Sequence, residues 1–391
     1  SSTVKSMQNE GVLVVTEDNC YRKVTSEAVI NEAEALPDIE LNDIQRQIVS
    51  EFGEEFERGI HRTYLLHGVT GSGKTEVYIH CIRRVIEQGK QAIVLIPEIA
   101  LTYQTIKHFT RYFGDRVTVV NSRLSSGEKY DQFERARKGD VDVVIGPRSA
   151  LFTPFERLGL IIIDEEHEGS YKSDNPPKYH ARETAIKRAE LEGASVILGS
   201  ATPSVESYKS ALEGRFKLWY MGERVSDRAM AETSIVDLRE ELRCGNRSII
   251  SNELAEDIAN RLENREQIML FINKRGFNSF VSCRNCGEVI KCPHCDVSMT
   301  RHISGSDGRL ICHYCGYAVD EPKTCPSCGS KLIGGYGTGT EKVEQEVRRM
   351  FPGARTLRMD RDTTSKKNSH EHILDSFGKG EADILIGTQM I

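Results

Sequence analysis

The sequence predicts an α/β protein of two lobes, each built on a parallel sheet, with a cysteine-rich insertion in the second lobe. Three observations lead to this fold class: a glycine-rich loop between a strand and a helix, apolar segments that alternate with helical patterns, and eight cysteines grouped in four C-x-x-C pairs. Near-continuous apolar strands that alternate with helices are typical of a parallel sheet covered on both faces. A chain of 391 residues is long enough for about two to three domains.

Composition and charge narrow the class of protein. The chain is 38% hydrophobic and 28% charged, which is typical of a soluble globular protein, and no run approaches the ~18 apolar residues of a membrane span. The first residues carry neither a signal segment nor an initiator methionine, so we expect a fragment or a processed chain. A net charge of −6 does not predict nucleic-acid binding, and any DNA contact would come from local basic patches.

The first 40 residues are predicted to precede the first lobe. Residues 1–24 combine a short helix, the strand VLVV and a turn, the shape of the end of a winged-helix domain and equally of a plain helix-to-strand corner. Residues 25–40 are polar and form a linker. The first lobe, residues 41–225, opens with a helix whose N-cap is Asn42 or Asp43. Gln45 in this helix could bind adenine through its amide, and the alternative is a solvated glutamine.

The glycine-rich loop has the context of a phosphate-binding P-loop. Residues 68–75 match G-x-x-x-x-G-K-T, an apolar strand precedes them, and a helical run to Gln88 follows. The glycines let successive backbone N–H groups turn towards phosphate oxygens, and the helix N-terminus favours an anion. Lys74 would reach the outer phosphates and the Thr75 hydroxyl would bind Mg²⁺. The residues expected to contact the nucleotide are Gly68, Val69, Thr70, Gly71, Ser72, Gly73, Lys74 and Thr75.

Polar residues follow four of the five buried-type strands predicted after this loop, at residues 92–96, 117–120, 142–145, 160–163 and 195–198. Ligands of parallel sheets bind at the carboxyl ends of the strands, so these polar ends indicate one site. Asp164 directly follows Leu-Ile-Ile-Ile, the position of a carboxylate that holds Mg²⁺. Glu165 is placed to orient or deprotonate an attacking water. Together with Lys74, these two carboxylates are the candidate catalytic residues.

The second lobe, residues 226–391, carries a cysteine-rich module at residues 281–331, after a strand at 268–272. Each C-x-x-C offers two thiolates to a tetrahedral ion, and two pairs complete a zinc site. Ligand spacing favours zinc over redox pairs, disulfides and iron–sulfur clusters, in keeping with a reducing cytoplasm. Eight cysteines fit two structural zinc ions and leave no vacancy for His294 or His313, but spacing alone leaves the pairing open. Cys20, Cys81 and Cys244 are expected to be plain thiols.

Three motifs together carry a resemblance to a known family. Residues 68–75, the box of Asp164, Glu165, Glu166 and His167, and the GSATP segment at 199–203 resemble motifs I, II and III of superfamily 2 helicases. The longer phrases LIPEIALT, GPRSALF, IIIDEEHEGSYK and YHARE are similar to the PriA-type primosomal replication-restart helicases. This resemblance implies tandem RecA-like lobes and a nested zinc module. One ion would bind Cys283, Cys286, Cys325 and Cys328, and the other Cys292, Cys295, Cys312 and Cys315.

For function, the resemblance implies an ATP-dependent 3′–5′ DNA helicase that recognises stalled or collapsed replication forks and helps to reload the replicative helicase. Its cofactors would be ATP, Mg²⁺ and two Zn²⁺. Its partners would be forked and single-stranded DNA, single-stranded DNA-binding protein, and primosome and helicase-loading proteins, in the bacterial cytoplasm at the nucleoid and not at a membrane. The expected contacts to DNA phosphates are Thr102, Arg148 and Ser149. The loop that carries Lys172, Tyr179 and Arg182 matches the family's aromatic-rich loop, which links DNA binding to hydrolysis, and the alternative is a solvated polar loop.

Two other interpretations compete with this one. Another superfamily 2 translocase, of repair or restriction, would lack a zinc module after the first strand of its second lobe. A non-enzymatic zinc-ribbon scaffold that only binds nucleotide would need neither the Asp164–Glu165 pair nor the GSATP segment. Members of the family extend beyond both ends of this chain, which stops in motif V. We therefore expect motif VI, with its arginine for the γ-phosphate, to be missing and the fragment to hydrolyse ATP poorly.

Overall fold

The chain divides into two compact units in the computed structural model, Ser1–Met230 and Ala231–Ile391. The structure describes residues 7, 11–12, 21–22, 39–97, 103–122, 124–174, 176–225, 231–246, 248–273, 281–283, 285–304, 307–335, 339–360, 363 and 369–388. Most of the predicted winged-helix remnant and linker, Cys20 and Thr102 lie outside these residues. Among the helices so described, none is both long and apolar enough to cross a membrane.

Unit 1 is built on a seven-stranded sheet in which every neighbouring pair of strands is parallel. The order is β3-β4-β2-β5-β6-β1-β7. The strands are β1 (Thr63–Gly68), β2 (Gln91–Leu95), β3 (Val117–Val119), β4 (Val143–Gly146), β5 (Leu158–Ile163), β6 (Ser195–Ser200) and β7 (Lys217–Met221). The helices are α3 (Asp43–Glu57), α4 (Lys74–Glu87), α5 (Tyr103–Phe113), α6 (Ser126–Lys138), α7 (Ala181–Glu192) and α8 (Val205–Leu212), with short 3-10 turns η1 (Gly114–Arg116), η2 (Arg148–Phe152) and η3 (Gly169–Tyr171).

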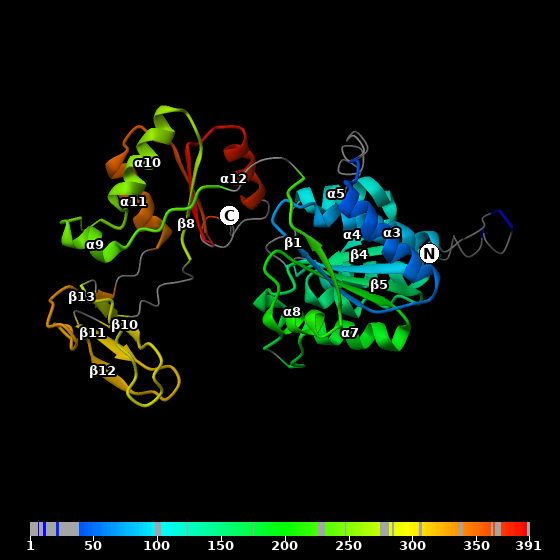
Figure 1. The fold of residues 1–391 in the computed structure, drawn as a ribbon, viewed down its shortest axis with the longest axis horizontal. Helices are drawn as coiled ribbons and strands as arrows, with labels where there is room; N and C mark the ends of the chain where they lie inside the picture. The colour runs from blue at the N-terminus through cyan, green and yellow to red at the C-terminus, as the bar shows by residue number, and fades with distance from the viewer. Residues whose placement is uncertain are drawn as a thin grey trace. The chain divides into compact units, whose positions relative to one another are not determined.

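Helices cover both faces of this sheet, as the apolar strands predict. Helices α3, α4 and α5 contribute to one apolar core, and α6, α7 and α8 contribute to the other. Figure 1 shows α3, α4 and α5 on one side of the strands and α7 and α8 on the opposite side. Strand β5, whose sequence is LGLIII, is buried along its whole length. The parallel α/β fold predicted from the sequence is therefore confirmed.

Strand β7 is absent from the sequence prediction. It pairs with β1 at the edge of the sheet, and its residues alternate between buried and exposed positions. Trp219 points into the core, where its ring stacks on Tyr64 with centroids 4.2 Å apart. An edge strand has one solvated side and lacks the continuous apolar run of a central strand, so its sequence is less distinctive.

Unit 2 contains a second parallel sheet and a separate group of antiparallel strands. The parallel sheet has the order β14-β15-β8, and its apolar clusters include residues of α10 and α11 on one face and of α12 on the other. The elements are α9 (Leu238–Arg243), α10 (Asn252–Glu263), β8 (Ile268–Phe271), α11 (Thr340–Met350), β14 (Thr356–Met359), α12 (Ser369–Gly378) and β15 (Ile384–Gly387).

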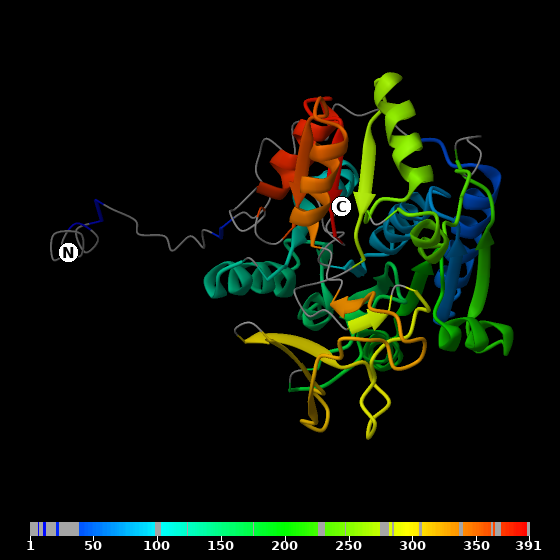
Figure 2. The same ribbon diagram turned by 90° about the vertical axis from the view of Figure 1, so that its left-hand side faces the viewer.

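The antiparallel strands form the cysteine-rich module, which lies apart from the parallel sheet in both views of the fold (Figures 1 and 2). They are β9 (Val281–Cys283), β10 (Thr300–Ser304), β11 (Asp307–Ile311), β12 (Ala318–Asp320) and β13 (Ile333–Gly335). Strands β10, β11 and β12 form one sheet, and β13 pairs with β9. The module therefore interrupts the lobe between β8 and α11, as the sequence predicts.

Candidate nucleotide and metal sites

The glycine-rich loop joins the end of β1 to the start of α4. The Lys74 Nζ donates a hydrogen bond of 2.9 Å to the Gly68 carbonyl oxygen, across the mouth of the loop. Gly73 has φ +79°, and a Cβ there would lie 2.3 Å from Gln45 Nε2 and 2.9 Å from a Val225 methyl. Only glycine fits this position without displacing its neighbours. The Ser72 hydroxyl is buried and has no hydrogen-bond partner among the described residues, as expected of a loop shaped for a polar ligand.

Gln45 supports this loop from helix α3. Its side chain is buried, and its Nε2 donates to the Ser72 carbonyl at 3.2 Å and to the Gly73 carbonyl at 3.3 Å. Its Oε1 accepts from the Asn42 N–H at 2.9 Å, which completes a capping box at the start of α3. The side chain of Gln45 is therefore not solvated, and both its amide nitrogen and its amide oxygen form hydrogen bonds within the protein. Binding of adenine by Gln45 stays a prediction.

Asp164 and Glu165 follow β5 at the same edge of the sheet. The Tyr78 hydroxyl of helix α4 donates to the Asp164 carboxylate at 2.9 Å, which ties this acid to the helix of the P-loop. The Tyr171 hydroxyl donates to the Asp164 carbonyl at 2.6 Å. Burial raises the pKa of Asp164, because desolvation disfavours the charged carboxylate. A metal cation bound to Asp164 would offset the cost of its buried negative charge.

Glu165 has a backbone conformation that is rare for a residue with a side chain. Its φ is +46°, a strained value of the kind that concentrates at functional sites. Burial and then the neighbouring Asp164 charge raise the pKa of its carboxyl group. A carboxylate with a raised pKa is a better proton acceptor than an exposed one. The geometry is therefore compatible with the predicted activation of water.

His167 connects this acidic box to the GSATP segment. Its Nδ1 lies 2.8 Å from the Ser200 hydroxyl, which in turn accepts from the Thr202 N–H at 2.9 Å. His167 Nδ1 also lies 3.6 Å from the Glu165 carboxylate. One short chain of contacts therefore runs from the candidate base to the segment after β6.

Glu166 makes a second, fully buried connection between the same segments. Its carboxylate accepts from the Ser204 N–H at 2.7 Å and from the Ser207 hydroxyl at 2.8 Å, both at the start of α8. Arg182 of helix α7 completes the network with an ion pair of 3.0 Å to Glu166. A buried carboxylate needs such a full set of donors. Neither serine is predicted from the sequence to belong to the site, although Ser204 has the sequence signal of an N-cap before α8.

The residues predicted to contact DNA lie in different surroundings. Ser149 and Lys172 are exposed. The Arg148 guanidinium donates to the carbonyls of Ser170 and Lys172, at 2.8 and 2.6 Å, and so holds the loop that follows the acidic box. Tyr179 packs edge-on against Phe152, with centroids 5.2 Å apart. Arg182 faces inward, towards Glu166, which does not favour a DNA contact. Thr102 lies outside the described residues.

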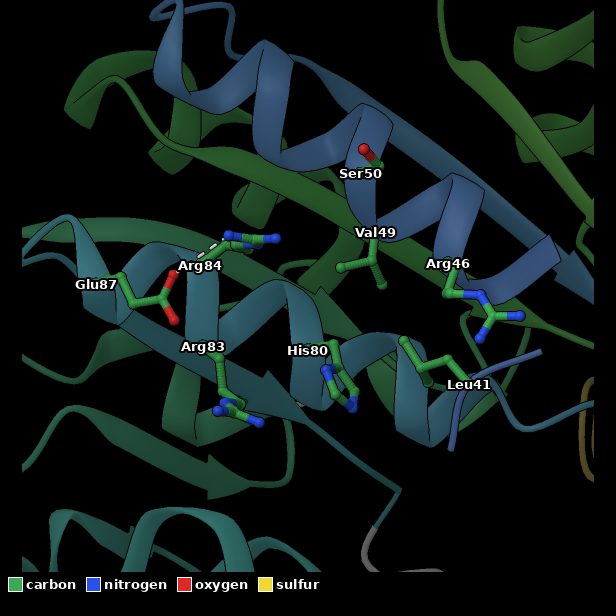
Figure 3. Close-up of a pocket in the computed structure, with 8 residues that line it drawn as sticks. All are labelled: Leu41, Arg46, Val49, Ser50, His80, Arg83, Arg84 and Glu87. Carbon is green, nitrogen blue, oxygen red and sulfur yellow. Dashed lines mark ion pairs between the residues drawn. The ribbon is translucent and has the colours of Figure 1, made fainter. Parts of the chain in front are cut away.

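A surface hollow of about 460 Å³ lies between α3 and α4. Figure 3 shows its lining side chains, which come from the two helices and from Leu41, two residues before α3. They are Leu41, Arg46, Val49, Ser50, His80, Arg83, Arg84 and Glu87. None belongs to the loop at 68–75, so this hollow is distinct from the phosphate-binding loop itself.

The eight cysteines of the module gather in two groups of four. The groups are Cys283, Cys286, Cys325 and Cys328, and Cys292, Cys295, Cys312 and Cys315, with the sulfurs of each group within 4.8 Å of one another. This is the nested arrangement that the resemblance implies, and neither His294 nor His313 belongs to either group of described ligands.

The sulfur spacing fits zinc. The pairs Cys283–Cys328, Cys286–Cys325 and Cys292–Cys315 have their sulfurs 3.6 Å apart, far longer than the ~2.05 Å of a disulfide. Four sulfurs at about 2.3 Å from a tetrahedral ion would be about 3.8 Å from one another. Each group can therefore hold one Zn²⁺ with little adjustment.

Each C-x-x-C pair has the same backbone geometry. The N–H of the first cysteine donates to the carbonyl oxygen of the residue five positions later, at 2.7–2.8 Å. The N–H of the residue four positions later donates to the carbonyl oxygen of that cysteine, at 2.8–2.9 Å. The residue after the second cysteine has positive φ in all four turns: Gly287, Asp296, Gly316 and Gly329. Glycine is favoured there because a Cβ opposes this conformation, and aspartate is one of the residues that tolerate it.

Comparisons with known proteins agree with this description. Residues 38–205 match the family described as the res subunit of type III restriction enzymes, and residues 292–319 match the Cys-rich region domain of PriA DNA helicase. The Replication restart protein PriA of Bacillus subtilis is 50% identical over 391 residues, covering 100% of this chain and 48% of the relative. That of Synechocystis is 44% identical over 398 residues, covering 100% and 47%. The chain thus spans about half the length of the curated relatives it matches.

Among solved structures, RecG bound to a three-way DNA junction aligns with 94% of this chain and 38% of its own, with a TM-score of 0.50 and 18% sequence identity. At this identity the likeness concerns the fold alone. It agrees with two lobes of parallel α/β architecture.

Proposed function

Because this chain matches the PriA family of replication restart proteins along its whole length, we propose that it forms the ATP-dependent motor of a 3′–5′ DNA helicase. The helicase would recognise stalled or collapsed replication forks and help to reload the replicative helicase. The observation that carries the proposal is the bonded connection from the P-loop helix to Asp164 and from the acidic box to the GSATP segment. A protein that only binds nucleotide needs no such connection.

The chain's own residues divide the work of ATP hydrolysis. Lys74 and the N–H groups of residues 68–75 would bind the phosphates, and Thr75 and Asp164 would hold Mg²⁺. The Mg²⁺ ion would neutralise charge on the phosphates when bound. Glu165 would orient a water and accept its proton. The Tyr78 hydroxyl, whose pKa is raised by burial, stays protonated and keeps the Asp164 carboxylate in place.

Loss of the γ-phosphate would shift the acidic box, and the box would transmit this shift to the residues proposed to contact DNA. His167 contacts Ser200 in the GSATP segment and Glu166 contacts Ser204 just after it, so a shift of the box would move both residues. Arg148 holds the loop that follows the box, and exposed Ser149 and Lys172 lie on the elements that it joins. We assign these two side chains to the DNA backbone, and Arg148 to positioning the loop.

The two zinc ions would be structural. A closed set of four thiolates leaves no open coordination position for chemistry. The strands of the module are three to five residues long, and its apolar cluster contains two of the ligand cysteines, Cys292 and Cys312. A module of this size depends on metal for its stability. Binding of loader proteins and of single-stranded DNA-binding protein is proposed from the family alone.

The test is steady-state ATP hydrolysis by the purified full-length protein with and without forked DNA. We expect DNA to stimulate hydrolysis and Lys74→Ala to abolish it, while a matched control, Lys187→Ala on the exposed side of α7, leaves it unchanged. Absence of DNA stimulation, or full activity in the Lys74→Ala variant, would contradict the motor assignment. Unwinding of forks with a single 3′ or 5′ tail then decides the polarity.

A further inference from the structure

A short strap crosses the phosphate-binding loop just after β7. We define the strap as residues 222–225. The Val69 N–H donates to the Met221 carbonyl at 3.0 Å, and the Val225 N–H donates to the Gly71 carbonyl at 3.1 Å. One hydrogen bond just before the strap and another at its last residue thereby join this segment to the loop. Together with Gln45, it holds the loop through residues that lie far from it in the sequence.

Arg224 is the one basic residue of this strap. Its methylene groups lie 3.9 Å from the position that a Cβ on Gly71 would occupy, at the tip of the loop. Its Nε is buried and has no hydrogen-bond partner in the part of the chain that the structure describes. A guanidinium carries five N–H donors and keeps its charge in proteins. An unsatisfied donor of this kind costs free energy unless a ligand or partner completes it.

We propose that Arg224 is a nucleotide-binding residue whose guanidinium contacts a phosphate of the ATP held by residues 68–75. This assignment rests on the proposed ATP site and extends it beyond the loop and the acidic box. The neighbouring loop is built to hold an anion, and arginine binds phosphate through paired, charge-assisted hydrogen bonds. Phosphate is therefore the ligand that both satisfies the buried donor and matches its position beside Gly71.

The strap also restricts the loop at Gly73. A Cβ on Gly73 would meet both a Val225 methyl and the Gln45 amide. A loop fixed in this way loses little freedom when the phosphates bind, because its backbone is already ordered. The strap has two charged residues, Glu223 and Arg224, and Glu223 is exposed. Arg224 would therefore be the residue of the strap that brings charge to the phosphates.

The experiment is equilibrium binding of a non-hydrolysable ATP analogue, ADP and adenosine to the 391-residue chain and its variants. Arg224→Gln should weaken binding of the ATP analogue about tenfold to a hundredfold, the range expected for hydrogen bonds to a charged group. Adenosine binding should change little, because adenosine has no phosphate. Arg224→Lys keeps the charge but not the planar pair of donors, so its loss should be intermediate. Arg215→Gln, at an exposed ion pair just before β7, is the matched control.

The outcomes separate this assignment from the ATP site itself. If the wild-type chain binds no ATP analogue, both fail. If Lys74→Ala abolishes binding but Arg224→Gln keeps wild-type affinity, the ATP site stands and the Arg224 contact is wrong. If Arg224→Gln weakens adenosine as much as the ATP analogue and also lowers the melting temperature without nucleotide, the residue has a structural role only, which likewise overturns the proposal.

Discussion

Asp164 lies at the end of a strand that is apolar on both faces, and its burial raises the pKa of its carboxyl group. A carboxyl group with a higher pKa in the folded chain binds a proton more tightly when folded than when unfolded. Its ionised form therefore lowers the free energy of unfolding at neutral pH, and this penalty is lost as pH falls through the raised pKa. A bound cation would therefore offset the free-energy cost of the buried Asp164 carboxylate.

We predict that Asp164→Asn raises the melting temperature of the metal-free chain at pH 7 while abolishing ATP hydrolysis. The amide removes the buried charge, and its oxygen can still accept from Tyr78. Each kcal/mol gained corresponds to about 2–4 °C for a unit of this size. The difference from wild type should shrink as pH falls, which thermal melts across a pH series will show. Asp174→Asn, at an exposed position, should have no such effect, and a destabilised Asp164→Asn variant would contradict the argument.

Arg182 is predicted to stabilise the fold through its ion pair with Glu166. The side chain of Glu166 is 0% exposed and that of Arg182 is 12% exposed. Removing one partner of a buried pair leaves the other charge uncompensated, at a cost of about 3–5 kcal/mol. Arg182→Ala should therefore lower the free energy of unfolding by that amount in denaturant titrations, whereas Lys187→Ala should not. Normal stability combined with weaker DNA binding would instead support the direct DNA contact expected from the sequence.

At the scale of elements, the carboxyl ends of β1, β5 and β6 meet because the three strands are neighbours in the sheet. Residues far apart in sequence thereby become bonded neighbours: Tyr78 with Asp164, His167 with Ser200, and Glu166 with Ser204. These side-chain bonds are joined by a backbone bond of 3.0 Å from the Glu166 N–H to the Gly199 carbonyl, so the acidic box is tied to the end of β6 and to the start of α8.

We predict that Ser200→Ala slows DNA-stimulated ATP hydrolysis while leaving ATP binding intact. The substitution removes the hydroxyl that joins His167 to Thr202 and leaves every side chain of residues 68–75 unchanged. A lost hydrogen bond of about 1.4 kcal/mol in the transition state corresponds to roughly a tenfold lower rate. The rate with and without DNA, measured beside ATP affinity, gives the answer. Ser210→Ala on α8 is the matched control, and equal loss of binding and rate would show that Ser200 serves the nucleotide site directly.

At the scale of the whole molecule, the two compact units report separately on folding. Trp219 is the single tryptophan of the chain and lies in the core of unit 1, where its Nε1 donates to Glu51 at 2.6 Å. Both cysteine groups belong to unit 2. Tryptophan emission therefore reports on the folding of unit 1, and metal content reports on the cysteine-rich module of unit 2.

We predict two zinc ions per chain, and unfolding of the cysteine-rich module when a strong chelator removes them. Structural zinc contributes on the order of 10 kcal/mol to the folding of small modules. Trp219 emission should stay unchanged, because its packing involves unit 1 alone, while circular dichroism should report loss of the antiparallel strands. Metal analysis that finds one ion or none, or a loss of tryptophan signal on chelation, would contradict this division.

The sequence by itself determined the strand-and-helix alternation of the two lobes, the P-loop, the acidic pair and the cysteine module. These features depend on local patterns: apolar runs of strand length, glycines at fixed offsets and repeated C-x-x-C spacing. Resemblance to a family then supplied the pairing of the cysteines, which the structure reproduces. The zinc turns follow from sequence because their hydrogen bonds join residues only four or five positions apart.

Only the tertiary structure decided how the polar residues of the site are satisfied. It brought Gln45 and the strap to the P-loop, turned Arg182 inward to Glu166, and joined the Tyr78 hydroxyl to Asp164. These partners are up to 154 positions apart, as Gly71 and Val225 are. The order of strands in the sheet sets such contacts, and no local pattern records that order.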